Sequence, residues 1–179
     1  MLTWLMLSAV RRLERRYDYD ASYIRALAAA SPKALMAFSG VGRLQGFREG
    51  APPEAIAAAA LAGTLNEDCG PCTQIVVRQA EERGVPPAIL AAILSGDGEA
   101  MGPDAGLAFG FARASLARDL ESSEDLRDEV VARWGRKGLA AIALALATAR
   151  VYPTVKYALG YGKACSKVTV GGRAIAVRA

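Results

Sequence analysis

An alanine-rich segment that leads directly into two closely spaced cysteines limits what this chain can fold into more than any other feature. Residues 54–65 have the composition of a helix, and a short polar break at Asn66–Asp68 separates them from Cys69-Gly70-Pro71-Cys72. The spacing of apolar residues predicts a second helix over 68–83, with Gly84 as its C-terminal stop. Because a helix rather than a strand precedes the cysteines, we expect the pair to lie in an all-α protein.

Prolines and glycines divide the remainder of the chain into further helical segments. The C-terminal residues 168–177 are the exception, since Gly171-Gly172 lies between two alternating β-prone stretches and predicts a short hairpin. A loop is expected at 40–50 and a glycine-rich linker at 95–106. The other expected helices cover residues 2–16, 21–30 (capped by Asp20), 32 onward (capped by Ser31), 86–94, 107–120, 122–134 and 139–152, with Gly135 and Gly138 separating the last two.

The chain of 179 residues suits a single domain. Within it we expect an N-terminal helical extension over 1–50, a helical core over 51–161 and a tail over 162–179. Hydrophobic residues make up 53% of the chain, above the usual share of about 45 to 50%, and much of the excess is alanine. This excess predicts close helix packing together with a subunit interface, and therefore a homo-oligomer.

The net charge of +4 does not predict a nucleic-acid partner. The only basic cluster, within 11–16, would lie on one face of the first helix, and no aromatic residues alternate with its arginines, so it is interpreted as a solvated face. The longest apolar runs, such as 139–149, fall short of the roughly 20 residues that cross a membrane, and no membrane partner is expected. Positive charges follow the apolar start of the chain instead of preceding it, so we expect a cytoplasmic location.

The two cysteines predict redox chemistry. Three residues apart on a helix, they share one face and lie about 4.5 Å apart along the axis, so their sulfurs can bond and separate again. With Asp68 as N-cap, Cys69 would lie in the first turn, where the helix dipole favours a thiolate. The chain contains no histidine, so another group must move protons. Glu67 and Asp68 beside the thiols, and Glu54 on the preceding helix, are candidate bases, although each also has an interpretation as a cap or a surface charge.

Other interpretations of the cysteine pair remain open at this point. Zinc needs four ligands, and with only Cys165 and carboxylates in addition, two subunits would have to share one ion. A pair without a function is a further alternative, and Cys165 itself is interpreted as a small buried residue. The same four residues form the thioredoxin motif, but the helix at 54–65 stands where that fold has a strand. We expect no metal and no cofactor, since the spacing at 40–42 does not fit a dinucleotide loop.

Over 52–161 the chain resembles the carboxymuconolactone decarboxylase and alkylhydroperoxidase D-like family. The resemblance rests on the alanine-rich helix from Glu54, the turn 67–72, the helix that follows it, and the order of the later helices. It implies an all-helical oligomer whose peroxidase branch reduces hydroperoxides through the cysteine pair, using a dithiol or protein reductant. It also implies that Cys72 reacts with peroxide and Cys69 resolves the product, whereas the helix argument favours Cys69 as the more acidic thiol.

The chain departs from this family at the residues that relay protons. Val76 and Pro71 occupy the positions of its histidines, and Ala57 occupies the position of its glutamate, with Glu54 one turn earlier. We therefore expect a cofactor-free thiol oxidoreductase, acting as a peroxidase, in which Cys72, Cys69 and either Glu67 or Glu54 are catalytic. The alternatives are a non-enzymatic helical oligomer that binds a ligand or partner and has redox-sensing or incidental cysteines, and, as a minor one, a lactone decarboxylase.

Overall fold

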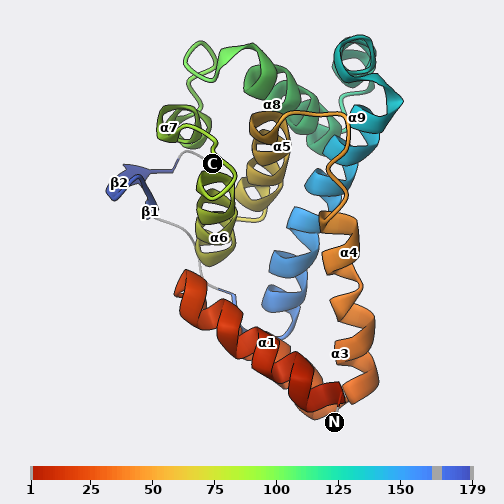
Figure 1. Ribbon diagram of the computed structural model, residues 1–179. Helices are drawn as coiled ribbons and strands as arrows, with labels where there is room; N and C mark the ends of the chain where they lie inside the picture. The colour runs from red at the N-terminus through yellow and green to blue at the C-terminus, as the bar shows by residue number, and fades with distance from the viewer. Residues whose placement is uncertain (1, 163–166, 178–179) are drawn as a thin grey trace.

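The computed structural model describes residues 2–162 and 167–177 and is mostly helical (Figure 1). A short antiparallel hairpin follows the helices, so the expected helical fold with a C-terminal hairpin is confirmed. The elements, in chain order, are α1 (Leu2–Tyr17), α2 (Ser22–Ala30), α3 (Pro32–Ser39), α4 (Val41–Gln45), α5 (Pro53–Asn66), α6 (Gly70–Glu81), α7 (Pro87–Ser95), α8 (Gly102–Ala117), α9 (Leu120–Ala158), β1 (Lys167–Val170) and β2 (Arg173–Ala176).

Helix α5 is the centre of the core. Every residue from Ala55 to Leu65 except Ala60 is buried, and α6, α7, α8 and α9 all contact the helix. A helix that is apolar on all sides is stable only when it is enclosed, and alanine side chains let the neighbouring helices approach closely. One close approach involves Gly63, where an added Cβ would lie 3.0 Å from the carbonyl oxygen of Leu146 in α9.

Helix α9 contains a break at Gly135, whose backbone is not helical (φ 68°, ψ 179°). Figure 1 shows the chain changing direction within this element. The break was expected at Gly135 and Gly138, but Gly138 is helical and has a different role. A Cβ on Gly138 would lie 3.1 Å from the carbonyl oxygen of Gly50, so this glycine allows the segment before α5 to pack against α9.

Within the described residues, α9 is also the single helix whose length and composition would allow it to cross a membrane. Its most apolar stretch has a mean hydropathy of 1.4, and 44% of that stretch is buried inside the molecule. The helix packs against α5 and α8. These contacts are those of a core helix, and such helices pass the same test of length and composition.

The first four helices cover one end of this core. Figure 1 shows α1 lying across the ends of α6 and α9, with α3 and α4 alongside α9. A second hydrophobic cluster joins the two parts, in which Tyr19 and Tyr23 are buried and Ile75 of α6 and Tyr152 of α9 pack against them. Residues of the expected N-terminal extension therefore share a core with the helices that follow.

Four local predictions need correction. The expected loop at 40–50 contains the short helix α4, which packs on α9. The linker at 95–106 is shorter than expected, because α8 begins at Gly102. The N-cap of α2 is Ala21, although the Asp20 side chain accepts a hydrogen bond from the backbone N–H of Ser22 (3.0 Å). Asp68 is not the N-cap of α6, since that position is occupied by Cys69.

The hairpin is closed by Gly171 and Gly172, both in the left-handed region (φ 54° and 80°), as a two-residue turn between twisted strands requires. The Gln74 side chain of α6 attaches the hairpin to the core. Its Nε2 donates to the carbonyl oxygen of Thr169 (2.9 Å), and its Oε1 accepts from the Thr169 N–H (2.7 Å). The hairpin thus packs beside α6 and α7.

Candidate functional site

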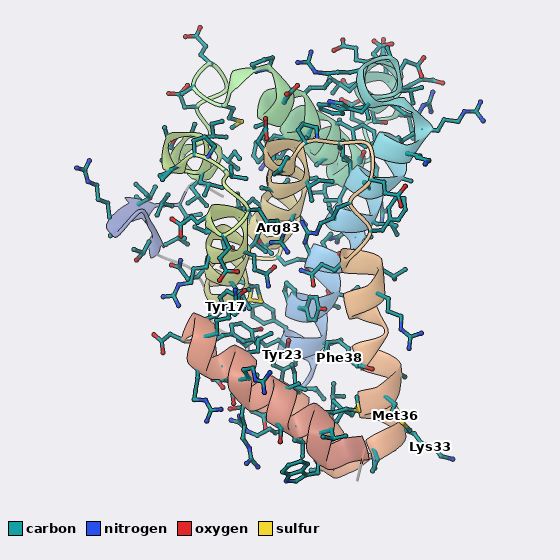
Figure 2. The ribbon with its side chains drawn as sticks, viewed as in Figure 1. Tyr17, Tyr23, Lys33, Met36, Phe38 and Arg83 are labelled. Carbon is teal, nitrogen blue, oxygen red and sulfur yellow. A yellow bond between two sulfur atoms is a disulfide. The ribbon has the colours of Figure 1, made fainter. Side chains whose placement is uncertain are left out.

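Cys69 and Cys72 form a disulfide at the N-terminal end of α6, with their Cα atoms 5.3 Å apart. The sulfur bond is visible in Figure 2 where α6 faces α1. Pro71 follows Gly70 in the first turn, where the missing N–H of proline costs no hydrogen bond. The expected proximity of the two thiols is confirmed.

The corrected helix start changes which cysteine lies in the first turn. Cys69 is the N-cap, with extended backbone, and Cys72 is three residues inside the helix. Asp68, with a left-handed backbone (φ 45°), lies before the cap, and its carbonyl oxygen accepts a hydrogen bond from the Tyr157 hydroxyl (2.8 Å). The unpaired N–H groups and dipole of the first turn therefore act on Cys72. The helix start thus favours Cys72 as the more acidic thiol, and the family resemblance implies that the same residue reacts with peroxide.

The two cysteines differ in what surrounds them. Cys69 is completely buried, and its carbonyl oxygen accepts hydrogen bonds from the N–H and hydroxyl of Thr73 (2.9 and 3.0 Å). Cys72 is 2% exposed and lines a partly enclosed cavity of about 80 Å³, which Cys69 does not line. A small molecule entering this cavity would therefore meet Cys72.

The cavity is mostly apolar and extends toward the N-terminal helices. A larger apolar cavity of about 270 Å³ lies beside it and shares Leu13, Ile24 and Tyr152 as lining residues. Gln45 of α4 accepts a hydrogen bond from the Tyr152 hydroxyl (3.4 Å) and donates one to Gln79 of α6 (3.5 Å), and all three side chains line the cavity at Cys72. The cavity is therefore formed jointly by the N-terminal segment, α6 and α9.

A buried group of two tyrosines and a lysine includes Tyr19, which contacts Cys72. The Tyr19 hydroxyl is 3.9 Å from Cys72 Sγ and 3.3 Å from the Tyr23 hydroxyl. The Nζ of Lys156, a completely buried side chain, lies 4.7 Å from the centre of the Tyr19 ring and 5.7 Å from that of Tyr23. In Figure 2, Tyr23 and Phe38 lie between α1 and the helices above it, and their rings meet edge to face at 6.0 Å.

Burial changes the proton affinity of these tyrosines. Loss of solvent raises the pKa of Tyr19 to about 12, despite the opposing effect of its hydrogen bond with Tyr23. The pKa of Tyr23 is also raised, mainly by burial and further by the neighbouring Tyr19. Burial raises the pKa of Tyr152 as well. Around neutral pH, all three hydroxyl groups are thus protonated and can donate a hydrogen bond.

The two expected glutamates lie at opposite ends of α5. Glu67 caps the C-terminal end of α5 next to the cysteine pair, but its Oε1 accepts a hydrogen bond from Nε of Arg150 in α9 (2.6 Å), and it does not line the cavity. Glu54 lies in the first turn of α5, roughly 18 Å along the helix from its other end, where the cysteines are. Of the expected catalytic residues, Cys69, Cys72 and Glu67 therefore lie close together, and Glu54 does not.

Val76 and Ala57, at two of the family's proton-relay positions, line different cavities. Val76 lines the cavity at Cys72, one helical turn further along α6. Ala57 lines a neighbouring cavity of about 20 Å³, with Arg48 and Arg83. Arg83 is labelled in Figure 2, beside α6. No described side chain other than Tyr19 makes a hydrogen bond with Cys72.

Sequence reasoning missed Tyr19, Tyr23 and Lys156. Tyr19 is 53 residues from Cys72 in the chain, and Lys156 lies near the far end of α9. The one signal in the sequence is the crowding of tyrosines at 17, 19 and 23, without a nearby motif that links them to the cysteines.

The described ranges contain no group of three or more histidine, cysteine, aspartate or glutamate side chains placed to hold a metal ion. Cys165, a candidate ligand in the two-subunit zinc alternative, lies outside the described residues.

Comparison of the chain with protein-family models, with curated proteins and with solved structures gives no match.

Proposed function

We propose that this protein is a cofactor-free thiol oxidoreductase that reduces hydroperoxides through Cys69 and Cys72, as a histidine-less relative of the alkylhydroperoxidase D-like family. The observation that carries the proposal is a cysteine pair at disulfide distance of which one member, Cys72, lines a cavity. A purely structural disulfide would need no cavity at one sulfur. The apolar lining suits an organic hydroperoxide.

The reaction has two steps in the protein. In the first, the Cys72 thiolate attacks the terminal oxygen of the hydroperoxide, the O–O bond breaks, and a sulfenic acid forms while the alkoxide takes up a proton and leaves as an alcohol. In the second, Cys69 attacks the sulfenic sulfur, the disulfide forms and water leaves. An external dithiol then reduces the disulfide and is itself oxidised, so that atoms and electrons balance over the cycle.

The proposal is tested by measuring consumption of cumene hydroperoxide by the reduced protein with a dithiol in excess. We expect Cys72→Ser to abolish turnover. Cys69→Ser, reduced and then freed of dithiol, should consume one equivalent of hydroperoxide and stop with a sulfenic acid at Cys72, which dimedone labelling and mass spectrometry detect. Cys165→Ser removes the third thiol and serves as the matched control, with turnover unchanged. Turnover that survives Cys72→Ser would contradict the proposal.

A second candidate is a helical protein that binds a small apolar ligand, with redox-sensing or incidental cysteines. The adjoining cavities of about 80 and 270 Å³ favour it. One experiment distinguishes the two proposed functions. A binding protein would retain an apolar fluorescent probe in the Cys72→Ser variant and show no peroxide turnover in the wild type.

The setting of this chemistry is likewise a proposal. We propose a homo-oligomer in the cytoplasm, where thiol reductants are abundant. Exposed Trp4 and Leu5 on α1 and Leu44 on α4 support an interface between subunits, since such an interface would remove large apolar side chains from water.

A further inference from the structure

We propose that Tyr19 is the catalytic proton donor of this site: its hydroxyl protonates the oxygen that leaves when Cys72 attacks a hydroperoxide. This inference rests on the proposed peroxidase function and adds to it the residue that performs the acid step. The chain has no histidine, so the side chain that most often serves as an acid near neutral pH is absent.

The geometry supports Tyr19 over the expected glutamates. Its hydroxyl is 3.9 Å from Cys72 Sγ, and Tyr19 and Cys72 line the same cavity. The leaving oxygen of the hydroperoxide is bonded to the oxygen under attack, so a hydroperoxide held in this cavity at Cys72 would bring its leaving oxygen within reach of the hydroxyl. Glu67 is held by Arg150 and Glu54 lies at the far end of α5, and neither lines the cavity.

The surroundings of Tyr19 suit a group that gives up a proton and regains it. The Tyr23 hydroxyl, at 3.3 Å, can donate to the tyrosinate oxygen, and the Lys156 ammonium, 4.7 Å from the ring centre, stabilises its negative charge. Lys156 is itself held by the carbonyl oxygen of Asp20 (3.4 Å). A buried anion at Tyr19 would thus have a hydrogen bond and a cation beside it.

The proton affinity of Tyr19 is consistent with this role. Burial, opposed by the Tyr23 hydrogen bond and increased slightly by Tyr152 and Asp20, raises the pKa of Tyr19 to about 12. The hydroxyl thus keeps its proton through the pH range in which a cysteine thiolate forms, whereas a histidine would lose its proton near 6.5. An alkoxide is far more basic than tyrosinate and would take the proton.

The proton balance closes over the cycle. Attack of the Cys72 thiolate breaks the O–O bond, and the departing alkoxide takes the Tyr19 proton to form the alcohol. When the Cys69 thiol attacks the sulfenic acid, the disulfide forms, and the thiol proton leaves with the sulfenic hydroxyl as water. The tyrosinate then takes up the proton equivalent that Cys72 released when it ionised, so that two thiols and one hydroperoxide give one disulfide, one alcohol and one water.

The test compares leaving groups that need a proton with those that do not. In Tyr19→Phe we expect the rate of Cys72 oxidation by cumene hydroperoxide to fall about 100-fold. Oxidation by a peroxycarboxylic acid, whose carboxylate leaves without a proton, and alkylation by iodoacetamide should change less than threefold. Tyr161→Phe is the matched control, because Tyr161 belongs to the same aromatic cluster but does not line the cavity, and all three rates should match the wild type.

A fall of equal size in all three reactions would overturn the inference, because Tyr19 would then act through the thiolate or the fold. Unchanged oxidation by cumene hydroperoxide would overturn it as well, while turnover lost in Cys72→Ser would still support the proposed function. A wild type that consumes no hydroperoxide would instead defeat the proposed function.

A measurement on the wild type covers the case in which Tyr19→Phe does not fold. The rate of oxidation by cumene hydroperoxide should rise as Cys72 ionises and then remain level to about pH 10, because the donor keeps its proton. A descending limb between pH 6 and 9 would reveal a more acidic donor and would overturn the assignment.

Discussion

Tyr19 and Tyr23 are nearly inaccessible to solvent, at 7% and 1% exposure, and their hydroxyls lie against each other. Both have a pKa raised by burial, so each binds its proton more tightly in the folded protein than in the unfolded chain. The stabilisation that this difference provides is complete below the unfolded value of about 10. It is lost as the pH rises from there through the folded value, about 12 for Tyr19.

We therefore expect the free energy of unfolding to fall above pH 10, by about 1.4 kcal/mol per pH unit for each buried tyrosine. Urea unfolding between pH 8 and 11.5 measures this, and absorbance at 295 nm reports ionised tyrosine. The Tyr23→Phe variant should show a shallower decline. A wild type whose stability is constant to pH 11.5, or a variant with the same decline, would contradict the burial of these hydroxyls.

The cysteine pair could be predicted from the sequence because both residues and the helix start lie within four positions. The choice of Asp68 as cap was wrong by one residue, since residue type alone does not reveal a left-handed backbone. Tyr19 and Lys156 could not be predicted, because only the packing of α1, α2 and α9 brings Tyr19 to Cys72 and Lys156 to Tyr19. A short-range pattern thus identified the thiols, while the groups that surround them depend on tertiary structure.

At the scale of the elements, the contact between α5 and α9 determines where the site lies. Gly63 of α5 faces Leu146 and Ala149 of α9, where an added Cβ would lie 3.0 Å from a carbonyl oxygen and 3.1 Å from the Ala149 Cβ. Thr64, the next residue, lines the cavity at Cys72 together with Ala149. Any separation of the two helices would therefore alter the cavity.

We expect Gly63→Val to lower the free energy of unfolding by about 2 to 3 kcal/mol, because the larger side chain forces two packed helices apart. Gly42→Val is the matched control. Gly42 also lies in a helix, but nothing is within 4 Å of its added Cβ, so stability should change by less than about 1 kcal/mol. Thermal and urea unfolding measure both variants. If both variants lost the same free energy of unfolding, helix propensity and not the close approach of α5 to α9 would explain the loss.

Most helices could be predicted because proline and capping residues define their ends. Ser31 accepts hydrogen bonds from the N–H groups of Lys33 and Ala34, as its position before Pro32 indicates. Helix α4 was missed because its segment is rich in glycine, which disfavours helix by roughly 1 kcal/mol per residue. Packing of α4 on α9 outweighs that preference, and no local pattern reports such a contact.

At the scale of the whole molecule, the N-terminal helices complete the site. Tyr19, Leu13, Ile24 and Gln45 all come from the first fifty residues and line the cavity at Cys72. The resemblance predicts a core over 51–161, but the lining of this cavity includes residues outside that range. The redox chemistry proposed here then requires that this whole arrangement persist in both states of the cysteine pair.

The disulfide closes a ring of only four residues, so it restricts the unfolded chain little. In the chain-entropy treatment, a loop of this size contributes about 2 kcal/mol, whereas the core of α5 and its neighbours is independent of the sulfur bond. We expect the reduced protein to remain folded, with a Tm lower by about 4 to 8 °C.

Thermal unfolding followed by circular dichroism, with and without a dithiol, measures the difference. The Cys69→Ser variant should unfold at the same temperature in both conditions and close to the reduced wild type. Unfolding of the reduced protein at room temperature would contradict this expectation, because it would make the disulfide a structural support. A small difference means that the pair can open and close on an intact scaffold, so that Cys72 lines the cavity beside Tyr19 in both states.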